Sequence, residues 1–449
     1  METLGVLIGS DDNAKHKWLE SQLTAQQEFF EMLLRDDLSV QVALLLLRLS
    51  VIPRMGYLTR VMPPRLTITH AASFDAIILG LAARKLGLPT PLPDEAKQLL
   101  SMPIRNGGFG LRSVASVCHV AYFSSIAQSV PDIIDVIPVL PSPTQAPFAR
   151  QLTDALNELL TSEITCGENG MIPTYYDANP APRGFQRALS AHLETRAYNS
   201  IIQDSEIGLK DLQRLTSSSA RYAGAWTTCL PSSPDLSIPD EDYRCAARLR
   251  LGLPVLGNLP KLCVCGIELN SDHAHFLSCQ QLIRSAMTVR HDQLVQLLAK
   301  FFRNVGAVVH VEPRIFDTNR LRPDLDILFA DQHILVDVTV VHPASPSRTS
   351  RVELAAATAA EAVKTRQYSE MASLNSAKLL AFAVESYGAF GKQAAELVQI
   401  LRRAADRTLM LTSMSGDYAI QALAVALQKG NCHVIRAGAI AARAAEIAQ

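Results

Sequence analysis

Two aspartates stand inside an apolar stretch of the chain. The segment LRPDLDILFADQHILVDVTVVHP, which begins at Leu321, contains Asp324 and Asp337 with twelve residues between them. Carboxylates beside Leu, Ile and Val are costly to bury unless a partner compensates their charge, and a divalent cation can do so. If a tight turn folds two strands back on each other, the two carboxylates can lie side by side. We therefore predict a Mg²⁺ site that activates water for attack on a phosphate. Asp326, on the same strand face as Asp324, and Asp331, in the turn, compete for this role.

A cationic group should accompany these acids, because charge develops on the phosphate during the reaction. Thr339 stands two residues beyond Asp337, where a lysine would be common, so Lys364 on the next predicted helix is the nearest candidate. Tyr368 follows four residues later and shares its helix face. Lys364 could stabilise charge, and Tyr368 could hold a phosphate or orient water. Alternatively, both are surface residues of an amphipathic helix. Glu312 is a possible additional metal ligand.

A compact group of cysteines and histidines precedes this region, in the segment CVCGIELNSDHAHFLSC. Cys263, Cys265, His275 and Cys279 offer the thiolates and imidazole that a tetrahedral structural Zn²⁺ site uses, with His273 as an alternative to His275. The Cys-x-Cys spacing is tighter than usual. The alternative is two core cysteines with surface histidines.

The elements needed to position these residues can be read from residue 284 onward. A helix is expected over 284–302, followed by three β-branched runs, AVVHVEP, LDILFA and HILVDVTVV, that suit strands. The next helix, from TSRVELAAATAAE, has Ser350 and Glu353 as a capping box. The strand KLLAFAVES and two Ala-rich helices close the chain. This order predicts an α/β fold with a mixed central sheet.

The first half of the chain differs in its hydrophobic periodicity and composition. Residues 1–135 follow helical periodicity, with an apolar helix broken at Pro53 and a second helical piece ended at Pro63 and Pro64. Pro/Ser-rich stretches then surround shorter helical pieces. We predict a multi-domain chain with an all-α N-terminal half, a small zinc knuckle and an α/β C-terminal domain. The expected regions are 1–135 (helical), 136–243 (helical linker), 244–283 (zinc knuckle), 284–430 (α/β domain) and 431–449 (Ala-rich tail).

Composition narrows the class of protein. The chain has 449 residues, 48% of them hydrophobic, and a net charge of −1, which is typical of a soluble globular protein and argues against wholesale wrapping of nucleic acid. No apolar run approaches the ~18 residues that span a bilayer, and the start of the chain lacks the features of a signal peptide. We therefore expect an intracellular protein with no membrane association. Its eight cysteines are not expected to form a disulfide framework. The five outside the knuckle are expected to be buried thiols: Cys118, Cys166, Cys229, Cys245 and Cys432.

Taken together, these motifs resemble a known family. The RPDLDILFADQHILVDVTVVHP segment is similar to the restriction-enzyme-like endonuclease of site-specific non-LTR retrotransposons, a branch of the PD-(D/E)xK nucleases. In that family the lysine is displaced to a following helix and a tyrosine comes soon after it. The resemblance assigns Asp324, Asp337, Lys364 and Tyr368 to the catalytic pattern. It also covers the preceding CCHC knuckle. LGVLIGS looks like the segment just after the polymerase palm, and LLLLRLSVIPRMGYLTRVMPP looks like the start of a reverse-transcriptase thumb. The resemblance thus implies that 1–135 holds the end of the palm and a helical thumb-like region.

The resemblance implies a Mg²⁺-dependent DNA endonuclease, with a structural Zn²⁺. It would nick target DNA for target-primed reverse transcription in the nucleus, with DNA and the element RNA template as partners. Arg248, Arg250 and Arg322 are the expected nucleic-acid contacts. The paired aspartates of a polymerase palm are missing from the sequence, so we expect the C-terminal portion of a longer polyprotein, without reverse transcriptase activity of its own. The alternatives are a non-catalytic nucleic-acid-binding remnant and a decayed retroelement fragment.

Overall fold

The chain divides into two compact units, and each is described by itself. The computed structural model describes residues 1–136, 157, 184–282, 284–313, 321–329, 332–407 and 416–447, so Cys166 and Asp331 lie outside the described residues. Unit 1 comprises Met1–Leu38, Val42–Pro103 and Gly110–Asp204. Unit 2 comprises Ser39–Gln41, Ile104–Phe109 and Ser205–Gln449.

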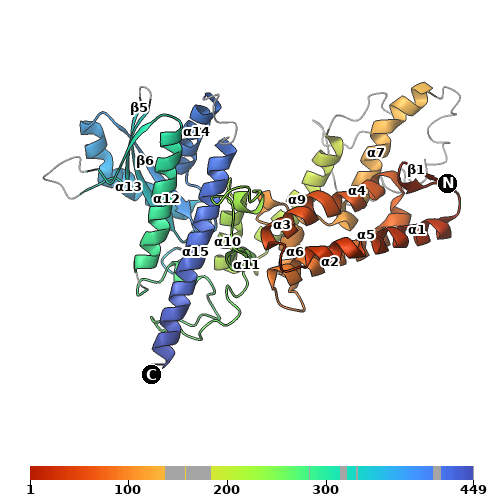
Figure 1. The fold of residues 1–449 in the computed structure, drawn as a ribbon, viewed down its shortest axis with the longest axis horizontal. Coiled ribbons are helices and arrows are strands. Elements are labelled where there is room, and N and C mark those ends of the chain that lie inside the picture. Colours follow the sequence, from red (N-terminus) through yellow and green to blue (C-terminus); the bar gives the residue numbers. More distant parts are fainter. Residues whose placement is uncertain are drawn as a thin grey trace. The chain divides into compact units, whose positions relative to one another are not determined.

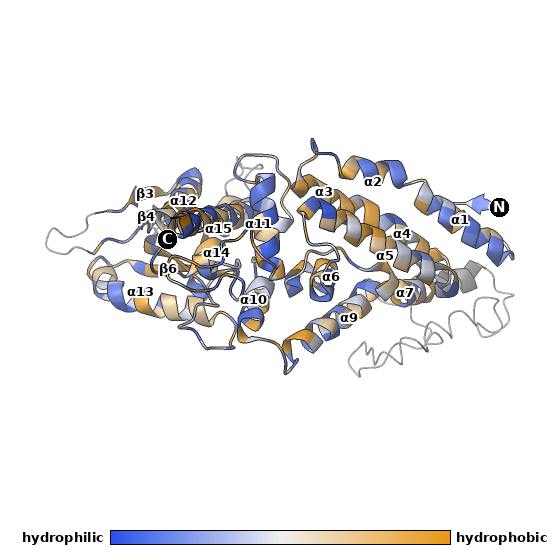
Figure 2. Ribbon diagram, turned by 90° about the horizontal axis from the view of Figure 1, so that it is seen from below, coloured by the Kyte–Doolittle hydropathy of each residue, from blue (hydrophilic) through white to orange (hydrophobic). Residues whose placement is uncertain are grey.

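Unit 1 is helical apart from a short N-terminal hairpin, β1 (Glu2–Thr3) and β2 (Val6–Leu7). Its core contains fully buried aromatic residues, among them Phe74, Phe123 and Phe185. Its most hydrophobic helices are drawn largely in orange in Figure 2. The helices are α1 (Asp12–Thr24), α2 (Gln27–Leu33), α4 (Ile52–Val61), α5 (Pro64–Leu86), α6 (Asp94–Ser101), α7 (Val114–Val136) and α9 (Phe185–Ile202).

Pro53 does not break the helix around it, contrary to the expectation from the sequence. Helix α3 (Val40–Leu46) continues through a π-helical turn, Leu47–Val51, directly into α4. Pro53 has no N–H to donate to the helical turn before it, and at that point the π-helical pattern replaces the α-helical one. The wider turn accommodates the proline ring. The break expected at Pro63 and Pro64 is present, since α4 ends at Val61 and α5 begins at Pro64.

Two helical stretches of this region are long and apolar enough to cross a membrane by length and composition. They are Val40–Val61, with a mean hydropathy of 1.4, and Pro64–Leu86, with a mean hydropathy of 1.5. Leu44, Leu47, Phe74 and Ile78 on these helices are buried within the protein. Core helices of globular proteins have the same character, so length and hydropathy alone do not assign a membrane role.

Unit 2 carries the mixed sheet predicted from the sequence. The strand order is β3 (Val308–Val311), β4 (Leu325–Phe329), β5 (Gln332–Val341) and β6 (Lys378–Glu385). The first three strands are antiparallel, and β6 runs parallel to β5. The predicted order of helix, three strands, helix, strand and helices is confirmed. The helices of this unit are α10 (Leu209–Ser219), α11 (Asp240–Leu251), α12 (Arg284–Asn304), α13 (Ala355–Leu374), α14 (Lys392–Arg407) and α15 (Gly416–Ile447).

Helices pack against this sheet and tie it to the cysteine-rich segment. Helix α12 contacts β3, β4 and β5, whereas α13 contacts β5 and β6 (Figure 1). The long helix α15 packs along α11, α12 and α14 and reaches the short 3₁₀ helix η5 (His275–Leu277). Residues 431–447, part of the expected tail, therefore belong to a packed helix.

The capping box predicted for α13 is wrong. The helix begins at Ala355, and its N-cap residue Leu354 has φ +59 and makes no side-chain cap. Glu385, at the end of β6, instead accepts the hydrogen bond of the Ala357 amide at 3.1 Å. A carboxylate near a helix N-terminus satisfies an otherwise unpaired N–H, and here it comes from a distant part of the sequence.

Candidate active site

The sheet register places the two aspartates opposite each other. Leu325 pairs with Val336 in the antiparallel β4–β5 ladder, so Asp324, one residue earlier, falls across from Asp337. Residues directly opposite in such a ladder share one face. The amide of Val338 donates a hydrogen bond to Oδ2 of Asp324 at 2.5 Å, which fastens this residue to β5. The structure thus brings both carboxylates to one place.

Helix α13 supplies the positively charged side chain, that of Lys364. Nζ of Lys364 lies 3.0 Å from Oδ2 of Asp337, whose side chain is only 4% exposed. Tyr368 is one turn further along, and its ring centre lies 6.0 Å from Nζ of Lys364. The Tyr368 hydroxyl donates to the carbonyl of Arg322 at 2.8 Å, and the ring is buried with Leu335. The helix therefore contributes a charged group beside one acid and a tyrosine that holds the segment carrying the other.

Close packing and burial shift the pKa values of Asp337 and Tyr368. Burial and repulsion by Asp324 raise the pKa of Asp337, and Lys364 and Tyr368 only partly oppose this. Burial, reinforced by Asp337 and Asp324, also raises the pKa of the Tyr368 hydroxyl, which therefore stays protonated and serves as a donor. Two carboxylates that repel each other in a buried place form an arrangement that a divalent cation would stabilise.

A histidine that sequence reasoning missed completes the group. Nε2 of His291, on α12, lies 3.1 Å from Oδ2 of Asp324, and Nδ1 lies 3.0 Å from Oδ1 of Asp292. The hydrogen bond to Asp324 is the main cause that raises the pKa of His291 to about 9. His291 is 33 residues from Asp324 along the chain. No local pattern links the two residues, and only the packing of α12 on the sheet brings them together.

The competing acids are placed differently. Asp326 lies between two histidines from the flanking strands, with Oδ2 3.2 Å from Nδ1 of His310 and Oδ1 2.7 Å from Nε2 of His333. Glu312 follows β3, and its amide donates to the carbonyl of Asp324 at 2.9 Å. Its side chain is exposed. Asp326 thus has its own partners, and Glu312 borders the site through its backbone.

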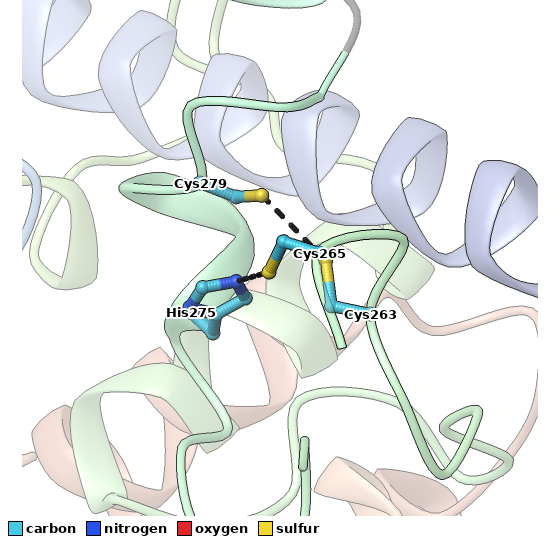
Figure 3. A group of neighbouring side chains, drawn as sticks. All are labelled: Cys263, Cys265, His275 and Cys279. Carbon is cyan, nitrogen blue, oxygen red and sulfur yellow. Dashed lines mark hydrogen bonds between the residues drawn. The ribbon is translucent and has the colours of Figure 1, made fainter. Parts of the chain in front are cut away.

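The cysteine-rich segment gathers four side chains into one cluster (Figure 3). The ligand atoms of Cys263, Cys265, His275 and Cys279 all lie within 4.8 Å of one another. Sγ of Cys263 is 3.6 Å from Sγ of Cys279, and Sγ of Cys265 is 3.0 Å from Nε2 of His275. The alternative ligand His273 faces elsewhere, with Nδ1 3.1 Å from the carbonyl of Leu269. Between the two histidines, the geometry favours His275.

The donor set fits a tetrahedral zinc ion. With Zn–S bonds of about 2.3 Å, the sulfur atoms of such a site are about 3.8 Å apart, close to the Cys263–Cys279 spacing. Burial lowers the pKa of His275, so its imidazole is neutral, which is the form that binds metal. Burial also opposes ionisation of Cys265. Hydrogen bonds from the Ile267 amide and from the neighbouring thiols outweigh that effect and lower the Cys265 pKa. The cluster could therefore bind zinc.

The predicted nucleic-acid contacts have different surroundings. Arg250 is buried, and its guanidinium donates to the carbonyls of Gly108, Ile104 and Ser218 at 3.1 to 3.3 Å. Its role as a phosphate contact was a wrong prediction, because those donors are used inside the protein. Arg248 is half-buried, whereas Arg322 is exposed next to Asp324.

Comparison with known proteins adds one relationship. No protein-family model matches the chain. The chain is 23% identical over 403 residues to the Retrotransposable element SLACS 132 kDa protein of Trypanosoma brucei gambiense. The match covers 87% of this chain and 28% of that protein, so the chain spans less than a third of its relative's length. This similarity supports a retrotransposon origin for the chain.

Proposed function

We propose that unit 2 is a Mg²⁺-dependent DNA endonuclease of a retrotransposon protein, which nicks its target DNA. One observation carries the proposal: Asp324 and Asp337 meet across the β4–β5 ladder, with Lys364 3.0 Å from Asp337. Two acids and a lysine at one end of a mixed sheet suit hydrolysis of a phosphodiester. The similarity to a retrotransposable-element protein is consistent with such a substrate.

Each residue has a distinct part in this proposal. Asp324 and Asp337 would hold Mg²⁺, which when bound activates water and stabilises charge on the phosphate. The Lys364 ammonium would face the negative charge that develops on the scissile phosphate. Tyr368, through its hydrogen bond to the Arg322 carbonyl, would fix the turn that carries Asp324. This positioning role replaces the direct phosphate contact considered from the sequence. Arg322, exposed beside the site, would contact the DNA backbone.

The wider setting is part of the same proposal. The nick would leave a 3′-hydroxyl for target-primed reverse transcription in the nucleus, with the element RNA as template. The helices of unit 1 would act as a thumb-like region, and the knuckle would use structural zinc. We propose that this chain does not copy RNA by itself. A primer-extension reaction with the purified chain should give no cDNA.

Conversion of supercoiled plasmid to nicked circles tests the cutting activity directly. The purified zinc-loaded chain should nick in Mg²⁺ and not without it. Asp324→Ala and Asp337→Ala should each reduce the rate at least 100-fold. Asp326→Asn is the matched control, because Asp326 is a carboxylate on the same strand that is held by His310 and His333. It should keep most of the activity. A wild-type chain that binds DNA but leaves the plasmid intact would instead identify a nucleic-acid-binding remnant.

A further inference from the structure

The setting of Asp324 raises the question of what holds its carboxylate in place. Asp324 precedes the first residue of β4, so the ladder does not fix it from both sides. Two donors converge on the same oxygen, Oδ2, namely the amide of Val338 and Nε2 of His291. Within the described part of the chain, Oδ1 accepts no hydrogen bond and is left for a cation.

The imidazole of His291 has a second carboxylate partner besides Asp324. Its second ring nitrogen faces Oδ1 of Asp292, so each nitrogen faces a carboxylate oxygen and each must donate. The preceding residue, Arg290, is buried and donates to Oδ1 of Asn431 on α15 at 2.8 Å. This bond joins α12 to α15 next to His291. The imidazole therefore reaches Asp324 from a helix that packs against both α15 and the sheet.

We infer that His291, held by Asp292, is a positioning residue that orients the Asp324 carboxylate so that its free oxygen faces a divalent cation. The inference rests on the proposed function, because it assigns His291 to the same Mg²⁺ site. Partners that orient a ligating carboxylate typically change metal affinity or activity by about 10- to 100-fold when they are removed. His291 acts through Asp324 and is not assigned a contact with the substrate.

Substitutions at position 291 can separate orientation from packing. In His291→Gln the terminal amide nitrogen can occupy the place of Nε2 and donate to Asp324. In His291→Asn the shorter amide can replace only Nδ1, toward Asp292. His291→Ala removes both donors. His310→Gln is the matched control, because it changes another histidine that contacts an aspartate of the same sheet, Asp326.

Binding of Mn²⁺, measured by electron paramagnetic resonance of the free ion, gives a readout that does not depend on cutting. The zinc-loaded full chain is used, and Asp337→Asn defines the binding lost with the site. We expect His291→Ala and His291→Asn to raise the Mn²⁺ dissociation constant about 10-fold or more. His291→Gln should stay within about 3-fold of wild type, and His310→Gln should match wild type. The Mg²⁺ concentration for half-maximal nicking should follow the same order.

The possible failures are distinguishable. If the wild-type chain binds no Mn²⁺ at this site, the proposed metal-dependent function is overturned and the inference with it. If the wild type binds Mn²⁺ and His291→Ala binds it equally well, only the positioning role is overturned. If His291→Gln is as weak as His291→Ala, the imidazole is needed as such, and an orienting hydrogen bond is not its role. Circular dichroism and zinc content identify any variant that has lost its fold.

Discussion

The ion pair between Lys364 and Asp337 offers a quantitative test of how the site is held together without a metal ion. Lys364→Met keeps most of the side-chain length and removes the charge. Two unit charges 3.0 Å apart attract by about 5.5 kcal/mol at an effective dielectric constant of about 20. Dehydration of Asp337 offsets much of this attraction, since its side chain is 4% exposed and that of Lys364 is 27% exposed. We expect Lys364→Met to destabilise the protein by about 3 kcal/mol, because it leaves a buried carboxylate beside Asp324.

The assay is urea unfolding followed by the fluorescence of Trp226, which is buried in unit 2. The chain has two tryptophans, so a Trp18→Phe background makes Trp226 the sole reporter. Measurements are made without Mg²⁺ and with zinc retained. The double variant Asp337→Asn/Lys364→Met should be more stable than the sum of the single changes predicts, by about 2 kcal/mol. Lys378→Met is the control, because its pair with Glu396 is about half exposed and should contribute less than about 1 kcal/mol.

Two results would refute this reasoning. One is a loss of stability in Lys364→Met no larger than that in Lys378→Met. The other is strict additivity of the Asp337 and Lys364 changes, since independent effects would mean that the two charges do not stabilise each other in solution.

Three further predictions concern other parts of unit 2, and a fourth concerns helix α5 of unit 1. Cys279→Ala, or removal of zinc with a chelator, should lower the unfolding midpoint, and atomic absorption should find one zinc per wild-type chain and less than one in the variant. Burial raises the pKa of Glu385, so the folded state binds the proton of this carboxyl more tightly than the unfolded state does. The free energy of unfolding should therefore fall as the pH rises from 4.5 through the folded pKa. In a series of urea midpoints measured against pH, Glu385→Gln should flatten that part of the curve. Gly438→Ala places a methyl group 2.6 Å from the ring of Phe276, so we expect a loss of about 1–3 kcal/mol. Gly80→Ala, with no atom within 4 Å, should instead raise the thermal midpoint slightly.

The sheet and its helices were predictable because their signals are local. Runs such as LDILFA and HILVDVTVV combine strand length with β-branched residues, and they became β4 and β5. Helix α12 was expected to end at residue 302 and ends at Asn304. The start of α13 was not predictable in the same way. Ser350 and Glu353 fit a capping box, but Glu385 reaches the first turn of the helix from the end of β6.

The candidate site likewise combines residues that local sequence could predict with residues that it could not. The apolar setting and spacing of Asp324 and Asp337 suggested that they meet, and the β4–β5 register brings them together. Lys364 was chosen as the nearest candidate on the next predicted helix, since the position two residues after Asp337 is a threonine, and the family resemblance then assigned it the same role. His291 could not be found from sequence, because its contact depends on how α12 packs. The prediction that Arg250 contacts nucleic acid failed for a related reason. A basic residue near a helix end gives no sequence signal that backbone carbonyls will surround its guanidinium.

The two candidate metal sites of unit 2 differ in how far they are satisfied without an ion. Each acid of the sheet site has a cationic partner from a different helix, Asp324 with His291 and Asp337 with Lys364. The sheet can therefore keep its shape in the absence of Mg²⁺, and a metal ion would compete with these partners. In the knuckle, the sulfur atoms of the buried residues Cys263 and Cys279 lie 3.6 Å apart, where a zinc ion would be bound by both. We therefore expect metal exchange at the sheet and lasting retention at the knuckle, which would suit the proposed catalytic site beside a proposed structural one.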